Sequence, residues 1–264
     1  MLVADLMTRY CDKVSQYKRG ADKEIARVMA FTRRDPLAKL PLEQLTPQAV
    51  ADWRDRRLTE VTPGTVNREW NILSNACNIA TKEWGWMSGN PFANVRRPKP
   101  PAPRDQVFGS SDADRILLST TRPVADVFRF ALETAMRAGE ITGLCWKDVG
   151  DKVVSLPVTK NGSKRVVPLS LCARQILADL PRGEPDQPVF RLDSAKLDRE
   201  FRKARKTAGL IGHHFHDARR TALTRLATKL GPMELAKVSG HKDLKILLNT
   251  YYAPDMDAMA DRLG

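Results

Sequence analysis

Hydrophobic residues recur every three or four positions through residues 1–93, the spacing of one face of an α-helix. The clearest stripe near the amino terminus has five members: Val3, Leu6, Met7, Tyr10 and Val14. A second stripe runs from Val66 to Ala80. Between the two, Thr46 and Pro47 mark a helix start, because threonine caps free backbone N–H groups and proline fits the first helical turn. The pattern therefore predicts a helical domain over residues 1–93.

The helical stripes stop at a proline-rich segment. The sequence NPFANVRRPKPPAPRDQ contains five prolines and four basic residues. Proline-rich chain is extended and semi-rigid, so we predict that residues 94–104 are a basic interdomain linker. A basic linker between two basic domains is typical of a clamp that closes around a polyanion.

Residues 105–264 are predicted to form a second domain, mostly helical. A helix should break near Arg137. The clear β signal is KVVSLPVTKNGSKRVVPLS, in which two valine-rich runs flank Asn161-Gly162, a strong hairpin turn. The predicted fold class is therefore α+β, mostly α, with an amino-terminal helical domain and a carboxyl-terminal domain of helices around a small antiparallel sheet.

Composition adds an argument from charge. The 264 residues include 44 Lys and Arg against 31 Asp and Glu, a formal net charge of +13. Such an excess favours a polyanionic partner, nucleic acid above all, and the alternative is a soluble protein that is merely basic.

Several features argue against a membrane or secreted protein. No stretch approaches the roughly 18 apolar residues of a transmembrane helix. Asp5 and Arg9 interrupt the amino-terminal stretch that a signal peptide would need. The cysteines are scattered along the chain: Cys11, Cys77, Cys145 and Cys172. This distribution fits a reducing cytoplasm, and we expect no disulfide, no zinc site and no membrane association.

Candidate chemistry begins with two basic residues of the second domain. Arg137 lies at the expected helix break, where Glu140 can brace its guanidinium while the fork binds a phosphate. Lys160 stands beside the predicted hairpin turn, where an ammonium can reach a leaving oxygen. The alternatives are an ordinary ion pair at Arg137 and a hairpin that is basic only for solubility, as Lys164 and Arg165 also suggest.

The segment HHFHDARRTALTRLAT places His216 and Arg219 three residues apart, on one face of a helix that starts near Asp217. His216, together with His213 and His214, also suggests a metal site. No cysteine adjoins the three histidines and no H-E-x-x-H helix is present, so the metal interpretation has little support.

A last motif, GHKDLKILLNTYYAP, places His241 ahead of the adjacent Tyr251 and Tyr252. Taken in order, the arginine, lysine, His-x-x-Arg, histidine and tyrosine motifs resemble the catalytic constellation of the tyrosine recombinases, the phage integrase family. The stretches that carry the resemblance are TAMRAGEITGLCWKDV, TKNGSKRVVPL, HDARRTALTRLA and SGHKDLKILLNTYY. They span the second domain, and the first domain more loosely resembles the family's core-DNA-binding domain.

The resemblance implies a site-specific DNA recombinase that works through a 3′-phosphotyrosine, without metal or cofactor. Arg137 and Arg219 would stabilise the five-coordinate phosphorus. His216 and His241 would donate further hydrogen bonds or move the nucleophile's proton, and Lys160 would protonate the departing 5′-oxygen. The tyrosine ester would store the bond energy, so religation would need no ATP.

The choice between the two tyrosines is less direct. Tyr251 follows His241 one residue later than is usual in the family, and Tyr252 two residues later. The spacing to DAMADRL favours Tyr251, whereas the YAP ending favours Tyr252. We predict Tyr251 as the nucleophile, with Tyr252 as the fallback. Arg220 stands where many relatives carry a histidine, and it either contacts DNA or lies outside the site.

The expected partners are double-stranded DNA at attachment or core sites, a homotetramer on that DNA, and accessory DNA-bending proteins, in the cytoplasm with the nucleoid. The expected role is integration and excision of a mobile element. Because the chain begins close to its first predicted helix, we expect it to leave no room for a separate arm-site-binding domain. A simple short-site recombinase stays open, and so does a sequence from which such a domain was removed. The alternatives are a catalytically inactive DNA-binding regulator of the same fold and a type IB topoisomerase-like nicking-closing enzyme.

Overall fold

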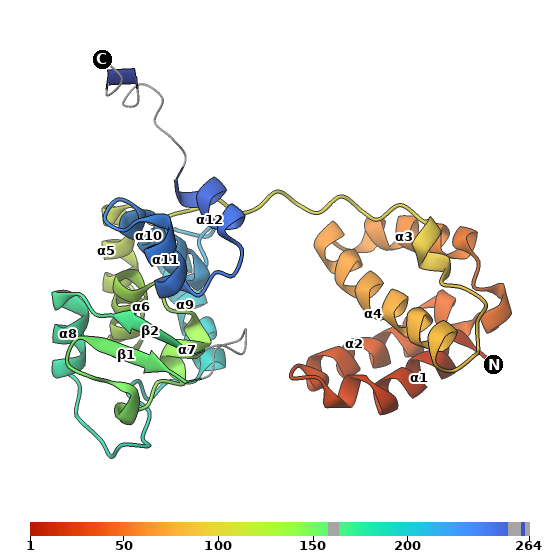
Figure 1. The fold of residues 1–264 in the computed structure, drawn as a ribbon, viewed down its shortest axis with the longest axis horizontal. Coiled ribbons are helices and arrows are strands. Elements are labelled where there is room, and N and C mark those ends of the chain that lie inside the picture. The colour runs from red at the N-terminus through yellow and green to blue at the C-terminus, as the bar shows by residue number, and fades with distance from the viewer. Residues whose placement is uncertain (158–163, 253–259, 262–264) are drawn as a thin grey trace. The chain divides into compact units, whose positions relative to one another are not determined.

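The computed structural model describes residues 1–157, 164–252 and 260–261 of the chain. The chain divides into two compact units, unit 1 (Met1–Arg104) and unit 2 (Asp105–Gly264). Helices dominate both units, and the described residues of unit 2 add a small antiparallel sheet (Figure 1). The predicted fold class, α+β and mostly α, is confirmed.

Unit 1 is a helical assembly around one apolar core. Its helices are α1 (Val3–Lys13), α2 (Ala21–Arg34), α3 (Pro47–Glu60) and α4 (Pro63–Lys82), with short 3₁₀ helices at Ser15–Tyr17, Pro36–Lys39, Leu42–Gln44 and Pro91–Asn94. The two predicted stripes pack into this core, Val14 being only partly buried. The Thr46 hydroxyl accepts the Ala49 N–H at 3.2 Å, and Pro47 is the first residue of α3, as predicted.

The segment after unit 1's last 3₁₀ helix first contacts α3 and α4 of that unit and then becomes exposed. Arg54 Nη1 donates to the Arg96 carbonyl at 2.8 Å, and Asn67 Nδ2 donates to the Pro98 carbonyl at 3.0 Å. Residues 99–107, all of which the structure describes, are exposed and have neither helix nor strand. The chain then enters the core of unit 2 at Phe108, whose backbone N–H donates to Thr221 Oγ1 at 2.8 Å.

Unit 2 is built around a central helix. Its elements are α5 (Ser110–Leu118), α6 (Arg122–Thr134), α7 (Ala138–Thr142), a 3₁₀ helix (Trp146–Asp148), β1 (Val153–Leu156), β2 (Arg165–Pro168), α8 (Leu171–Ala178), α9 (Ser194–Thr207), α10 (Phe215–Ala227), α11 (Pro232–Ser239) and α12 (Leu244–Tyr251). Helix α6 packs against α8, α9 and α10, and its Phe128 ring lies 5.3 Å from that of Phe201. The helix break predicted near Arg137 falls between α6 and α7.

The hairpin of β1 and β2 follows the two-residue alternation of a half-buried sheet. Leu156 pairs with Arg165 and Val154 with Val167, and all four side chains lie on the buried face. Val166 is exposed on the other face. The predicted Asn161-Gly162 turn lies outside the described residues.

The carboxyl-terminal helices form a separate small cluster in unit 2. Its buried residues come from α10, α11, α12 and the end of α6, and Tyr251 and Tyr252 pack against it. Helix α11 also packs against β2, so the carboxyl-terminal segment lies beside the hairpin (Figure 1). None of the helices in the described ranges is long and apolar enough to cross a membrane.

Candidate active site

Two helix ends supply the framework of the site. Helix α6 is followed by Ala135 in the left-handed region, with φ of 54°, and α11 ends at Ser239, followed by Gly240 with φ of 71°. Carbonyl groups at a helix end lack partners within the helix and carry its partial negative charge. From α10, Arg219 uses both of these ends: Nη1 donates to the Ala135 carbonyl at 2.5 Å, and Nη2 donates to the Ser239 carbonyl at 2.6 Å.

A shared carboxylate holds two further arginines. Glu140 accepts the Arg137 backbone N–H at 2.7 Å and Arg137 Nη1 at 2.9 Å, so the predicted bracing of Arg137 is confirmed. The same carboxylate accepts Arg165 Nη2 at 2.6 Å. Arg165 Nη1 donates to the Ser239 carbonyl, the group that also receives Arg219. Arg137, Arg165 and Arg219 therefore converge on one carboxylate and one main-chain carbonyl.

Gly240 is required where α11 approaches the hairpin. A Cβ atom on this residue would lie 2.8 Å from Arg165 Nη1 and 3.2 Å from Arg165 Cδ. Its φ of 71° is also one that L-residues rarely adopt. A side chain here would have to displace Arg165, which explains in physical terms why a glycine precedes His241.

The cluster carries more positive than negative charge. Arg219 is 4% exposed and Arg165 8%, and Glu140 is the carboxylate that faces them within the described residues. Burial, together with the charges of Arg137 and Arg165, lowers the pKa of Arg219 to about 9, which leaves it a cation at neutral pH. Burial also lowers the pKa of Arg165, against the opposing effect of Glu140. A buried site with more positive than negative charges favours the binding of an anion.

His241 is held beside this cluster. Its Nδ1 lies 2.7 Å from the hydroxyl of Ser239, which is fully buried. Burial, followed by the charges of Arg219, Arg137 and Arg165, lowers the pKa of His241 from 6.5 to about 4. The imidazole is therefore neutral at physiological pH and has one N–H to offer.

The two tyrosines occupy different environments. The Tyr251 ring lies 6.4 Å from that of His241, and the Arg220 guanidinium lies 5.8 Å from the centre of the same ring. Burial raises the pKa of Tyr251, and the charges of Arg220 and Arg219 partly oppose that rise. The Tyr252 hydroxyl instead donates to the Leu230 carbonyl at 2.6 Å. Among the described residues, the Tyr251 hydroxyl makes no hydrogen bond.

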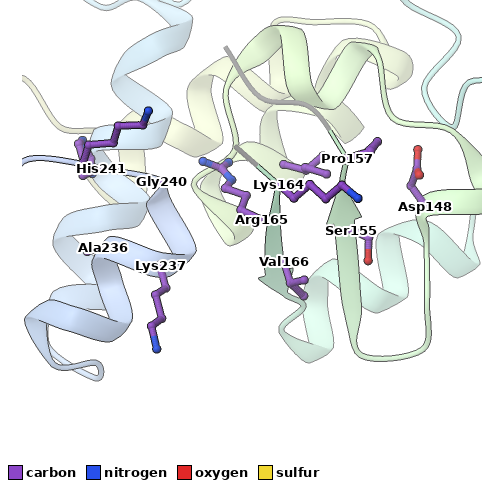
Figure 2. A pocket seen from close by; sticks show the side chains of 12 residues that line it. Asp148, Ser155, Pro157, Lys164, Arg165, Val166, Ala236, Lys237, Gly240 and His241 are labelled. Atoms are coloured by element: carbon purple, nitrogen blue, oxygen red, sulfur yellow. The ribbon is translucent and has the colours of Figure 1, made fainter. Parts of the chain in front are cut away.

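A pocket of about 750 Å³ opens between the hairpin and α11, and His241 lies on its wall (Figure 2). Arg165 points toward Gly240 across this pocket. Lysines from three segments complete its basic lining: Lys164, Lys237 and Lys242. Arg165 and His241 therefore line a pocket whose wall carries three lysines and the carboxylate of Asp148.

Comparison with known proteins assigns this arrangement to a family. The sequence profile of the phage integrase family matches residues 112–257, which include every arginine, histidine and tyrosine of the site. The chain belongs to the phage integrase family. It is accordingly a tyrosine-type site-specific recombinase.

Relatives of this integrase are similar over nearly the whole chain. A Haemophilus influenzae protein described as an integrase/recombinase is 41% identical over 271 residues, covering 96% of this chain and 73% of its own length. The shufflon-specific DNA recombinase of Escherichia coli is 34% identical over 94% of this chain and 68% of its own. A lambda integrase (75–356) dimer bound to a COC′ core site has the same fold, with a TM-score of 0.77, 21% identity and coverage of 93% and 97% of the two chains.

The structure gathers most of the predicted site residues of this integrase. Arg137, Arg219 and His241 are linked by hydrogen bonds through Glu140, Arg165 and Ser239. The Tyr251 ring lies 6.4 Å from that of His241. His216 lies in the first turn of α10, which begins at Phe215 rather than near Asp217, and its side chain is exposed. Lys160 lies outside the described residues.

The three histidines do not form a metal site within the described ranges, which hold no metal-binding group of three or more His, Cys, Asp or Glu. The His213 ring instead lies 4.5 Å from the Phe108 ring, and His214 is the cap residue of α10.

Two residues of the site were not predicted. Arg165 entered the sequence analysis only through the alternative of a hairpin that is basic for solubility, and for Arg165 that alternative is wrong, because the side chain is buried and paired with Glu140. The alternation of the hairpin carried the signal, since Arg165 has the parity of buried Val167 whereas Lys164 has that of exposed Val166. For Ser239 the sequence offers no comparable signal. Arg220, left open by the sequence, lies against Tyr251.

Proposed function

We propose that this integrase cleaves and rejoins duplex DNA through a 3′-phosphotyrosine at Tyr251, and that it integrates and excises a mobile element. The supporting observation is the contrast between the two tyrosines. Tyr251 lies beside His241 and Arg220, with its hydroxyl unbonded among the described residues, while the Tyr252 hydroxyl is taken up by Leu230.

The arginine cluster suits the phosphate of this reaction. Arg137 and Arg219 would bind its non-bridging oxygens, because guanidinium groups match phosphate geometry and each retains N–H groups beyond those used in the protein. A phosphodiester would supply the negative charge that the cluster lacks. As the phosphorus becomes five-coordinate, the preorganised cations would stabilise the added charge without moving.

The chemical step balances without a metal or an energy source. The Tyr251 oxygen forms a bond to phosphorus and passes its proton to His216, which returns it on religation, and the bond to the 5′-oxygen breaks. Lys160 would give that oxygen a proton, and His216 and His241 would hold the phosphate. A 5′-hydroxyl of the partner strand then attacks the phosphotyrosine, and Tyr251 leaves with a proton regained. One phosphodiester is exchanged for another.

The proposed assembly draws on the relatives. One solved lambda integrase structure is a tetramer bound to a Holliday junction, with 20% identity and a TM-score of 0.76 over 92% of this chain and 78% of its own. We propose that this chain likewise acts on double-stranded attachment or core sites as a homotetramer, aided by accessory DNA-bending proteins. Residues 1–93 would bind the core DNA, residues 94–104 would connect the domains, and residues 105–264 would hold the chemistry.

The test is covalent trapping on a nicked attachment-site duplex. The nick lies close to the cleavage site, so the short 5′-hydroxyl fragment diffuses away and the adduct accumulates. Wild type, Tyr251→Phe and Tyr252→Phe are compared at protein concentrations that bind all of the DNA. Denaturing gels detect the adduct, and tandem mass spectrometry locates the modified tyrosine.

We expect adduct from wild type and Tyr252→Phe, with the nucleotide remnant on Tyr251, and none from Tyr251→Phe. The reverse pattern would retain the enzyme and move the nucleophile to Tyr252. If no protein formed an adduct on DNA that it binds, the cleavage proposal would be wrong and the chain would act by binding alone.

A further inference from the structure

We propose that Ser239 is a positioning residue that holds His241 in the tautomer with its proton on Nε2, so that the neutral ring donates a hydrogen bond to the scissile phosphate. The contact with phosphate rests on the proposed function; the tautomer rests on the structure of the protein alone. Ser239 is the last residue of α11, and Figure 2 shows His241 directly beyond Gly240 on the wall of the pocket.

The direction of the hydrogen bond follows from the competition for the serine proton. The Ser239 hydroxyl lies 2.7 Å from His241 Nδ1 and 3.3 Å from the Ala236 carbonyl. That carbonyl already accepts the Gly240 N–H at 2.8 Å. The hydroxyl has one proton, and the Ala236 carbonyl is both the more distant acceptor and already hydrogen-bonded, so we infer that the proton goes to the closer Nδ1.

A bond donated to Nδ1 decides which ring nitrogen carries the proton. A neutral imidazole has one N–H, and when Nδ1 accepts, that N–H is on Nε2. Burial, followed by the charges of Arg219, Arg137 and Arg165, lowers the pKa of His241 and keeps the ring neutral. A neutral ring with the opposite tautomer would turn a lone pair toward an anionic phosphate and would repel it.

Ser239 also ties the histidine to the arginines. Its carbonyl accepts Arg219 at 2.6 Å and also accepts Arg165, while its hydroxyl holds His241. The residue is fully buried, so neither contact competes with water. Ser239 therefore fixes the distance between the guanidinium groups and the imidazole. Its two contacts can be tested independently, because the arginines bind its main-chain carbonyl and His241 binds its side chain.

The first measurement is the tautomer itself, in DNA-free protein. The chain has four histidines, and ¹⁵N-histidine spectra resolve protonated from unprotonated ring nitrogens in each. His241→Gln assigns the signals. We expect an Nε2-protonated ring in the wild type and a mixture of tautomers in Ser239→Ala. An Nδ1-protonated ring in the wild type, or an unchanged ring in Ser239→Ala, would overturn the proposal.

The second measurement is the single-turnover cleavage rate on saturating nicked duplex. Ser239→Ala keeps the carbonyl contacts and should slow cleavage about tenfold, the scale of losing a group that orients a reacting imidazole. Ser15→Ala is the matched control, because Ser15 is also fully buried and its hydroxyl donates to Glu24 at 2.8 Å in unit 1. It should leave the rate unchanged.

A double-mutant cycle then tests the route. If Ser239 acts through His241, Ser239→Ala should have no further effect in the His241→Gln background. A full tenfold loss there would overturn the positioning role. Failure of the wild type to form any adduct would remove the proposed function while leaving the tautomer measurement to stand or fall by itself.

Discussion

At the scale of single residues, the described part of the site holds more cations than anions, with Arg165 and Arg219 buried and Arg137 half-buried. Within the part of the chain that the structure describes, Arg219 has carbonyl partners and no carboxylate of its own, and Glu140 is divided between Arg137 and Arg165. Burying charge is costly when it is not compensated, and several kcal/mol per ion is a common magnitude. A bound phosphodiester would compensate it, so the protein's own electrostatics favour the substrate.

Arg165 provides the first prediction at this scale. Replacing Arg165 with Gln removes an anchor of Glu140 and of the Ser239 carbonyl, so Arg137 and Arg219 lose their fixed separation. We expect single-turnover cleavage of saturated DNA to fall by roughly 10- to 100-fold, the cost of a small misplacement of catalytic groups. The matched control is Arg202→Gln, an exposed arginine of α9 whose partner is Asp198 at the surface, which should change the rate less than about twofold, within the weak effect of surface charges. Equal losses in the two variants would contradict a positioning role.

The residue scale also shows what local sequence can and cannot predict. Arg137 and Glu140 were paired correctly because three residues along a helical turn guarantee proximity. Ser239 could not be predicted, because its partners lie 20 and 74 residues away and bind its main-chain carbonyl, which no residue type encodes.

At the scale of elements, the ends of helices matter more than their lengths. The ends of α6 and α11 face Arg219, and the left-handed residues Ala135 and Gly240 terminate the helices there. For Ala135 this conformation costs about 1 kcal/mol. The geometry of the arginine site is thus set by where two helices stop.

Gly240 gives a prediction for this scale. Gly240→Ala should lose about 1 kcal/mol of unfolding free energy from its positive φ, and about 1–3 kcal/mol more from collision with Arg165. The single-turnover cleavage rate of Gly240→Ala should also fall, because Arg165 is displaced. Gly85→Ala is the control, because Gly85 has φ of 64° but no described atom within 4 Å of an added Cβ. Peptide-resolved hydrogen exchange gives the unfolding free energy of each unit.

The control should show the cost of backbone strain alone, with cleavage unchanged. If both variants lost the same free energy and kept the same cleavage rate, contact with Arg165 would not be the reason for the glycine.

Elements were predicted well where periodicity was strong and less well at their ends. The stripes of α1 and α4 and the alternation of the hairpin were sufficient to locate them. The start of α10 was placed too late. The Asp217 carboxylate reaches back to the His214 N–H at 2.8 Å, so the helix begins before the residue that was taken as its start.

At the scale of the whole molecule, net charge is the property that sequence alone determined. An excess of +13 over two units suits binding to a polyanion along much of the protein surface. How the units cooperate on DNA is not encoded in any local pattern, because it depends on the path of the DNA.

Binding should therefore weaken steeply with salt. Each phosphate contact contributes about −0.9 to the slope of the logarithm of the DNA association constant against the logarithm of salt concentration. An interface of about 6–10 contacts would therefore lose roughly 10³- to 10⁵-fold in affinity between about 50 and 200 mM salt. Fluorescence anisotropy with a labelled attachment-site duplex measures the slope, and a neutral osmolyte series separates ionic from osmotic effects. A slope near zero would contradict a multi-contact DNA interface.

The acceptors of Arg219 have a further consequence for how this enzyme can change over generations. Both are main-chain carbonyls, of Ala135 and Ser239, and every amino acid carries one. Point mutations at these positions leave the acceptors in the chain, whereas a side-chain acceptor would be erased by a single codon change. Substitutions at Ala135 or Ser239 therefore do not remove the acceptors of Arg219. Loss of these hydrogen bonds requires mutation of Arg219 itself or of the turns that end the two helices.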